Sequence, residues 1–331
     1  MHGRSLLIFA AILTTSLRAQ GQAPPAPQVT VAGLVYTQYQ YTDAAVHTNT
    51  FDVTRAYLNV LGRFANGIST RLTTDIIPSA ATNQVIRLKY AYVAWTPTGS
   101  NLTYKLGMIH TPFLDWEETL WDYRMQGTMA VDRNPVGGPS TMTAADIGVG
   151  VDGHWNGEQV NGQFTIVNGE GYSGGTGDFR KDVQARVSVR VQPTNDNSRV
   201  GGLRVTGYAG IGKATGGADR NRYLGMLSYR TQRYTLAGEF VSVKNAAVTG
   251  SIISAFGVYH LSSPSKVALI ARVDMFDPNT STANNRQTRI IGGASYQLSP
   301  NVRLLADVDR LSFESGATAT NQILFQTQFT F

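Results

Sequence analysis

Residues 183–191, Val-Gln-Ala-Arg-Val-Ser-Val-Arg-Val, decide the fold that the sequence predicts. Alternate positions of this stretch carry valine or alanine, and the positions between them carry Gln184, Arg186, Ser188 and Arg190. Successive side chains of a β-strand point to opposite faces, so the alternation predicts a strand with one apolar and one polar face. A strand of this kind fits either a membrane barrel or a soluble sheet, so its repetition along the chain has to decide between them.

Sixteen segments with this period are separated by turn signals. They are residues 29–41, 50–64, 67–77, 84–95, 102–110, 145–155, 159–168, 181–191, 200–212, 220–229, 234–244, 251–261, 266–276, 286–298, 302–311 and 321–331. Short connections alternate with mostly longer ones, which are residues 42–49, 111–144, 169–180, 277–285 and 312–320. Outer-membrane barrels alternate short periplasmic turns with longer outer loops. The sequence therefore predicts an all-β transmembrane antiparallel β-barrel of about 16 strands.

Composition supports this fold class. The 331 residues include Gly 34, Tyr 15 and Phe 13, with no cysteine and only 15% charged residues, which suits many strands and glycine turns. Beyond the first 21 residues no window of about 18 residues is continuously apolar, which excludes a conventional membrane helix. A soluble barrel of this length would need a very large apolar core. Periodicity alone does not orient the faces, so a soluble secreted β-protein stays as the alternative.

The N-terminus predicts export. His2 and Arg4 precede an apolar run at residues 6–13, followed by small or polar residues, which is typical of a secretory signal peptide. We expect the signal peptide to span residues 1–21, with cleavage between 19 and 23. A Pro-rich leader is expected at 22–28, and the barrel at 29–331. The predicted location is the bacterial outer membrane.

The last segment closes on an aromatic residue. Residues 321–331 alternate Ile323, Phe325, Phe329 and Phe331 with glutamine and threonine. This resembles the terminal strand of outer-membrane proteins, whose closing aromatic residue is recognised by the barrel-assembly machinery. The resemblance implies that Phe329 and Phe331 form an assembly signal. The alternative is an ordinary edge strand that ends in phenylalanine, which would leave an exposed apolar edge.

A second resemblance concerns function. Residues 104–113, Tyr-Lys-Leu-Gly-Met-Ile-His-Thr-Pro-Phe, are similar to the strand leading into Thr-Pro-Phe in the phosphate-selective porin O/P family. The resemblance implies a sixteen-stranded, trimeric anion porin. Two departures are Leu114, where that family usually has glycine, and the lack of a lysine-rich outer stretch. The prediction is therefore a general porin that passes small anionic or polar solutes, with phosphate as one candidate.

The longest connection, residues 111–144, is the third outer loop. In sixteen-stranded porins that loop folds into the lumen and narrows it, so the resemblance implies a constriction loop here. A helix is expected at 115–125, with Asp115 as its cap and Glu118 three residues on. Trp116, Leu120 and Tyr123 would face the wall. The charges of the loop are Asp115, Glu117, Glu118, Asp122 and Arg124. The alternative is a surface loop without a constriction role.

Strand parity predicts which charges face the lumen. The bases are Arg55, Arg71, Arg87, Lys89, Lys105, Arg186, Arg190, Arg204, Arg222, Arg230, Arg272, Arg289 and Arg303. The acids are Asp75, Asp146, Asp152, Glu239, Asp274, Asp307 and Asp309. An excess of bases inside a low-dielectric wall concentrates anions. We expect a mild anion preference, strongest near Arg71, Arg87, Lys89 and Lys105, which the acidic loop opposes. Alternatively, these charges only hydrate the lumen and pair across it.

Other function classes find little support. Residues 171–175 match Gly-x-Ser-x-Gly around Ser173, but a nucleophile elbow needs a preceding strand and a following helix, and here Gly175, Gly177 and Asp178 follow in what looks like a flexible outer loop. The five histidines show no metal-ligand spacing and there is no cysteine, so no metal or cofactor is predicted. The basic residues are dispersed, which excludes a nucleic-acid partner. The expected partners are outer-membrane lipid, the solutes, the assembly machinery and, in a homotrimer, two further copies. The alternative to a porin is a non-conducting barrel that serves as a surface anchor, adhesin or barrel enzyme.

Overall fold

The computed structural model describes residues 26–78, 84–132, 141–174, 178–214, 216–261 and 266–331. The predicted signal peptide and residues 22–25 of the predicted leader lie outside the described residues. The first strand begins at Gln28, directly after two residues without regular structure.

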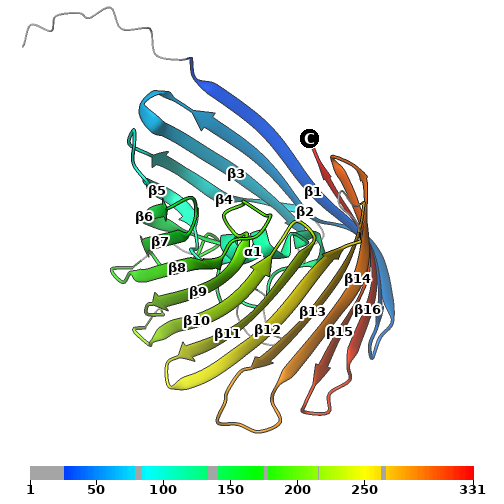
Figure 1. Ribbon diagram of the computed structural model, residues 1–331. Coiled ribbons are helices and arrows are strands. Elements are labelled where there is room, and N and C mark those ends of the chain that lie inside the picture. Colours follow the sequence, from blue (N-terminus) through cyan, green and yellow to red (C-terminus); the bar gives the residue numbers. More distant parts are fainter. Residues whose placement is uncertain (1–25, 79–83, 133–140, 175–177, 215, 262–265) are drawn as a thin grey trace, which may run out of the picture.

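Sixteen antiparallel strands close into one barrel, as the sequence predicted (Figure 1). Each strand pairs with the next in the chain, and β1 pairs with β16 to close the ring. The strands are β1 (Gln28–Asp43), β2 (Thr48–Arg63), β3 (Ile68–Pro78), β4 (Gln84–Trp95), β5 (Leu102–His110), β6 (Ala145–Trp155), β7 (Val160–Val167), β8 (Asp182–Gln192), β9 (Gly202–Ile211), β10 (Arg220–Arg230), β11 (Tyr234–Asn245), β12 (Val248–His260), β13 (Val267–Asp277), β14 (Gln287–Ser299), β15 (Val302–Phe313) and β16 (Thr320–Thr330). Because every strand has a neighbour on each side, the sheet has no edge strand, which a barrel in lipid requires.

The predicted strand ends differ from the observed ones by a few residues. The largest shift is in β12, which starts at Val248 where residue 251 was expected. Ala246 adopts a positive φ of 53°, so the chain reverses tightly and Asn245 already pairs with Val248. Residues 245–248 of this turn, Asn-Ala-Ala-Val, contain no glycine or proline that would mark it.

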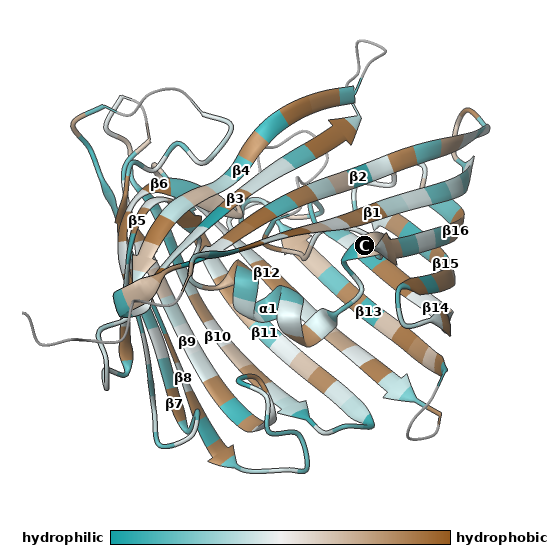
Figure 2. Cartoon of the chain, turned by 90° about the horizontal axis from the view of Figure 1, so that it is seen from above, coloured by the Kyte–Doolittle hydropathy of each residue, from teal (hydrophilic) through white to brown (hydrophobic). Residues whose placement is uncertain are grey.

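The apolar face of the strands points outward. Figure 2 shows hydrophobic and hydrophilic residues alternating along the strands. On β10, for example, Leu227 is 56% exposed, whereas Met226 and Ser228 beside it are buried. Large apolar side chains on the outer surface of a closed barrel are stable in lipid and unfavourable in water. The exposed apolar surface therefore rules out the alternative of a soluble secreted β-protein.

Aromatic side chains gather at both ends of this apolar surface. At the end formed by the short turns, the rings of Trp95 and Tyr104 lie 5.8 Å apart and those of Tyr234 and Tyr259 stack at 5.3 Å. At the other end the ring of Phe51 lies 4.9 Å from Tyr39. Exposed aromatic side chains near both ends of the apolar surface are typical of the lipid–water boundaries of a membrane barrel. No helix among the described residues is long and apolar enough to cross a membrane.

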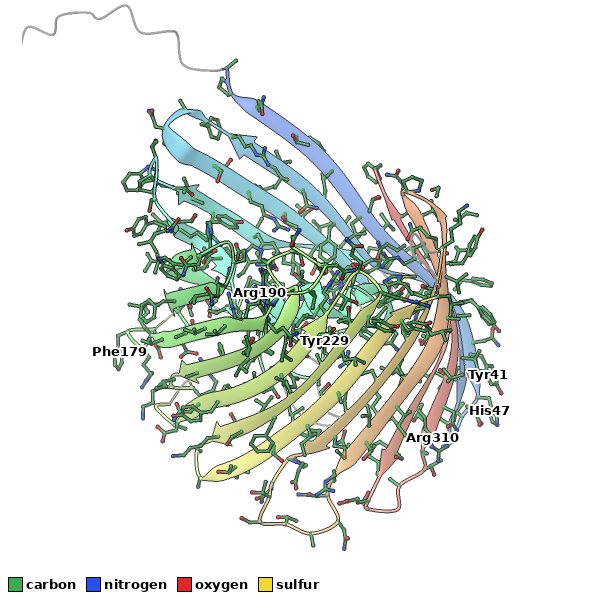
Figure 3. The ribbon with its side chains drawn as sticks, in the orientation of Figure 1. Tyr41, His47, Phe179, Arg190, Tyr229 and Arg310 are labelled. Atoms are coloured by element: carbon green, nitrogen blue, oxygen red, sulfur yellow. The ribbon has the colours of Figure 1, made fainter. Side chains whose placement is uncertain are left out.

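The longer loops lie at one end of the barrel. Figure 3 labels Tyr41 and His47 at the β1–β2 hairpin, where they project away from the barrel wall. Their rings stack at 6.4 Å, and His47 lies 3.1 Å from Asp43. These exposed contacts shape an outer hairpin and are remote from the interior.

The chain's last residue takes part in closure. Gly33 on β1 donates its N–H to the carbonyl of Phe331 at 2.8 Å, and Phe331 donates back to Gly33 at 3.2 Å. The ring of Phe331 covers Gly33 so closely that a Cβ there would lie 2.1 Å from it. Phe329 pairs with Val35, two residues further along each strand. The terminal strand thus completes the barrel, and recognition of Phe329 and Phe331 during assembly stays a prediction.

Candidate functional site: a cavity between a basic wall and an inward loop

The loop of residues 111–144, called the inward loop below, carries the helix α1 (Leu114–Trp121) inside the ring of strands (Figure 2). A single 3-10 turn, η2 (Arg124–Gln126), follows it. The helix is shorter than predicted because Asp122 adopts a left-handed φ of 55° and caps the helix through its N–H to the Glu118 carbonyl. Asp115 is not its N-terminal cap, since the helix starts one residue earlier. Residues 133–140 of this loop lie outside the described residues.

One side of the inward loop forms an apolar core with the wall. Trp116, Leu120 and Trp121 are each at most 1% exposed. The Trp121 ring meets Phe256 of β12 edge to face at 5.4 Å. The inner faces of β9 to β15 supply apolar partners, which are Tyr208, Leu224, Met226, Ala237, Val241, Val243, Ile252, Phe256, Val258, Ala268, Ile270 and Leu305. The alternation in the sequence predicts a polar inner face on almost every strand, and this apolar half of the interior differs from that prediction.

Arginines of β8, β10, β13 and β15 hold the loop's backbone. They donate to carbonyl oxygens of the inward loop at 2.7–3.0 Å, in the pairs Arg186 to Pro112, Arg230 to Thr119, Arg303 to Asp122, Arg272 to Thr128 and Arg222 to Thr141. An irregular loop inside a barrel has few backbone partners of its own, and unpaired buried carbonyls are costly. Arg186 and Arg303, predicted to attract anions, are therefore engaged with the loop.

Arg190 and Arg204 are engaged with the short turns. Arg204, fully buried, donates to the carbonyls of Gly201 at 3.0 Å and Glu158 at 2.5 Å. Arg190 donates to Gly201 at 3.0 Å and Ser198 at 2.8 Å. Both side chains point inward, as parity predicted, and their donors bind the protein's own backbone.

A cavity of about 440 Å³ lies between the polar side of the inward loop and the wall of β1 to β5. We call it the constriction cavity. Its lining comprises Leu34, Tyr36, Tyr57, Asn59, Arg71, Thr73, Lys89, Tyr90, His110, Asp115, Glu118, Thr119, Asp122, Arg124, Arg230 and Gln328. Of the nine bases predicted to attract anions, it brings together Arg71 and Lys89. Of the five loop charges, it contains Asp115, Glu118, Asp122 and Arg124.

Arg71 is fixed by neutral partners. Its three nitrogens donate to Thr73 Oγ1 at 3.0 Å, His110 Nε2 at 3.1 Å and Asn59 Oδ1 at 3.1 Å. A guanidinium only donates, so His110 must accept through Nε2 and carry its proton on Nδ1. The guanidinium also lies 4.5 Å from the centre of the Tyr90 ring.

Lys89 is 4% exposed and donates to Tyr57 Oη at 3.2 Å. Its ammonium lies 4.8 Å from the centre of the Tyr57 ring and 5.4 Å from that of Tyr90. In the part of the chain that the structure describes, neither Lys89 nor Arg71 has a carboxylate within ion-pair distance. Among the described residues, these two cations of the wall therefore form no ion pair.

The remaining predicted bases are paired. Arg55 and Arg87 both bind Asp75 Oδ2, at 2.9 and 2.8 Å, and Asp75 is fully buried. Lys105 forms an ion pair with Asp152. The Arg55–Asp75–Arg87 group keeps one net positive charge, and it lies on β2, β3 and β4 beside the constriction cavity.

The acids of the inward loop are paired as well. Asp115 binds Arg199 at 2.7 Å, Glu118 binds Arg124 at 2.8 Å and Asp122 lies 3.3 Å from Arg303. Glu117 does not line the cavity: it is fully buried on another side of α1, next to Glu239 of β11. The acidic side of the cavity is thus largely neutralised, whereas the basic side is not.

Sequence reasoning did not single out Tyr36, Tyr57, Tyr90 and His110. Tyr57 shares the inner face with Arg55 two residues before it, so parity could have found it. Tyr90 could not be found in this way. The register between β3 and β4 shifts at Thr73 and Thr74, where Lys89 is an extra residue of β4, so the adjacent Lys89 and Tyr90 are both buried inside.

Comparison with known proteins identifies the type of fold. No protein-family model matches the chain and no curated protein matches it in sequence. Among solved structures it resembles an anion-selective porin from Comamonas acidovorans (12% identity, TM-score 0.64, covering 92% of this chain and 100% of the other). It also resembles OmpT of Vibrio cholerae (13%, 0.64, 93% and 98%) and Salmonella typhi OmpF (11%, 0.62, 91% and 97%).

The chain therefore has the fold of a porin-type barrel. Its barrel matches bacterial outer-membrane proteins, which agrees with the location predicted from the sequence. Within the described residues no group of three or more His, Asp or Glu side chains could hold a metal ion.

Proposed function

We propose that this chain is an outer-membrane porin through which small hydrophilic solutes diffuse, with a mild preference for anions. One observation carries the proposal: Arg71 and Lys89 line the constriction cavity without a carboxylate partner among the described residues, while the loop acids facing them are paired. An uncompensated positive field inside a low-dielectric wall raises the local concentration of anions. An anion-selective porin among its structural neighbours is consistent with this proposal.

The resemblance of residues 104–113 to the phosphate-selective porin O/P family makes phosphate one candidate solute. The same resemblance implies a homotrimer, and one of the similar solved structures is described as a trimer form. The Ser173 hydroxyl accepts a hydrogen bond from Arg87 of the barrel wall at 3.0 Å, and this contact is the only role that we propose for Ser173. We propose no enzymatic role for it.

A second candidate function rests on the apolar packing of the inward loop, which fills part of the interior. In this alternative the barrel conducts nothing and serves as a surface anchor, adhesin or barrel enzyme. The two candidates differ in one measurable property, the passage of ions.

Planar bilayers test the proposed function. Purified protein is expected to give stepwise conductance in potassium chloride and a reversal potential in a salt gradient whose sign indicates anion preference. Lys89→Glu should shift that potential toward cations, whereas Lys181→Glu, on the exposed outer loop, should leave it nearly unchanged. Absence of conductance steps would favour the non-conducting barrel, and a cation-selective wild type would refute the anion preference.

A pH-dependent charge in the inward loop gives a further prediction. Burial raises the pKa of Asp132 to about 6, although Arg124, 3.7 Å away, acts in the other direction. Below pH 6 Asp132 is neutral, so Arg124 keeps only Glu118 as an acidic partner and the field near the cavity becomes more positive. We therefore expect anion selectivity to rise as pH falls through 6.

Reversal potentials measured across this pH range check the prediction. Asp132→Asn should fix the selectivity near its acidic value, and Asp178→Asn, on an outer loop, should keep the wild-type pH dependence. The assignment to Asp132 fails if the asparagine variant still responds to pH as the wild type does.

A further inference from the structure

We infer that Arg71, Lys89 and Tyr57 form a binding site for a small monocarboxylate on the wall of the constriction cavity. The inference rests on the proposed function and names the solute class that the pore would favour. It is carried by the two unpaired cations, by the hydrogen-bonding groups left over around them, and by the charges of the loop on the other side.

Lys89, Arg71 and Tyr57 have N–H and O–H donors that are not used in hydrogen bonds within the protein. A lysine ammonium has three donors and an arginine five. The Lys89 ammonium uses one on Tyr57 Oη, and Arg71 uses three on Thr73, His110 and Asn59. Tyr57 accepts from Lys89 and keeps its own O–H to donate.

The nearby acceptors are already in use. Asn59 Oδ1 receives Arg71 at 3.1 Å and the Thr73 hydroxyl at 2.7 Å. His110 Nε2 receives Arg71. A ligand beside Arg71, Lys89 and Tyr57 therefore meets N–H and O–H groups together with positive charge, while the acceptors Asn59 and His110 beside it are engaged with Arg71.

A carboxylate has this chemistry. When ionised it only accepts hydrogen bonds, and its two oxygens can bridge two donors. Phosphate at neutral pH carries at least one O–H in its common forms, and a large share of its molecules bear a second negative charge. The loop carboxylates of Asp115 and Glu118 line the same cavity, so a second negative charge is repelled more strongly than a single one.

The cavity also has room and apolar surface for the rest of such a molecule. Leu34 and the rings of Tyr36 and Tyr57 line it beside the cations, and its volume of about 440 Å³ lies in the range of small-molecule sites. The rings of Tyr36 and Tyr57 meet edge to face at 6.3 Å, which fixes their orientation. A short hydrocarbon chain or a single ring fits against these side chains while its carboxylate meets Lys89.

Competition with chloride in planar bilayers tests the inference. Acetate and benzoate, added at neutral pH to both sides at a fixed low chloride concentration, are expected to reduce the chloride current in a saturable way. Phosphate at the same concentration should bind at least several-fold more weakly. Lys89→Met should weaken acetate binding about tenfold, as expected for loss of one charge-assisted hydrogen bond. Tyr57→Phe should weaken it a few-fold.

Lys181→Met is the matched control, since it removes a lysine charge from the exposed outer loop and should leave acetate binding unchanged. Correct folding of each variant is checked by its resistance to unfolding in detergent at room temperature. Chloride conductance without saturation by acetate, or phosphate binding as tight as acetate, would overturn the inference while leaving the porin function intact. Unaltered acetate binding by Lys89→Met would also overturn it. A protein without chloride conductance would instead contradict the proposed function itself.

Discussion

Replacing Trp121 by alanine is expected to detach the inward loop from the wall and to give a larger, noisier single-channel conductance. Trp121 is fully buried between the helix and β12, where its ring meets Phe256 at 5.4 Å and Tyr123 at 5.8 Å. Truncation of a buried tryptophan to alanine costs about 3–5 kcal/mol. The strand ladders do not involve this side chain, so the cost falls on the docking of the loop.

Hydrogen bonds between the wall and the loop backbone limit the displacement of the loop in this variant. Arg230, Arg272 and Arg303 still donate to loop carbonyls after the substitution, so we expect local mobility and not expulsion. Limited proteolysis of the folded barrel should detect this mobility as new cleavage within residues 111–144.

Trp155→Ala is the matched control, because that tryptophan is 40% exposed on the outer surface. It should alter neither conductance nor cleavage of the loop. Unchanged conductance and unchanged protease resistance in Trp121→Ala would contradict the view that the apolar core holds the loop.

The barrel itself was predictable because its physical cause is local. Lipid outside and water inside impose an alternation of side chains that can be read at any strand, and the polar positions of residues 183–191 do face inward. The alternation of loop lengths is equally local. Ala246 marks the limit of such reading: a tight turn without glycine or proline left no signal in the sequence, and the strand end was misplaced.

The constriction cavity was only partly predictable. The alternation along a strand shows which side chains face inward, but it does not show which of them line the cavity. Strand alternation places both Arg71 and Arg186 on the inner face. Arg71 lines the cavity, whereas Arg186 lies against the inward loop. Which half of the interior the loop covers is decided by contacts between residues far apart in the chain, such as Trp121 with Phe256. The same limit applies to the helix, where Glu117 is fully buried and the next residue, Glu118, forms an ion pair with Arg124.

Glu117 carries a second large effect, this time on stability. It is fully buried beside Glu239 of β11, and in the described part of the chain no donor other than this neighbouring carboxyl reaches its oxygens. Burial raises the pKa of Glu117 well above its usual range, and the charge of Glu239 raises it further. Two buried carboxyl groups in contact can hydrogen-bond only when one of them carries a proton.

Glu117→Gln is therefore expected to stabilise the barrel at neutral and alkaline pH. A carboxyl whose folded pKa is raised keeps its proton in the fold, while the unfolded chain releases it above the ordinary value of about 4.3. Between those two values the wild type loses about 1.4 kcal/mol of stability per pH unit. Glutamine has no proton to release and an amide that can donate to Glu239, so the variant escapes this loss.

The free energy of unfolding, measured by urea titration in lipid vesicles between pH 4 and pH 8, tests this expectation. Variant and wild type should be nearly equal at pH 4, and the advantage of the variant should grow as pH rises. Glu118→Gln, at the next residue, removes a partly exposed ion pair with Arg124 and should cost at most about 1 kcal/mol. A Glu117→Gln barrel that is less stable at pH 8, or whose advantage does not change with pH, would show that Glu117 is ionised inside the fold. In that case the negative charge of Glu117 would have to be balanced by Arg272, which already pairs with Asp274 at 2.7 Å.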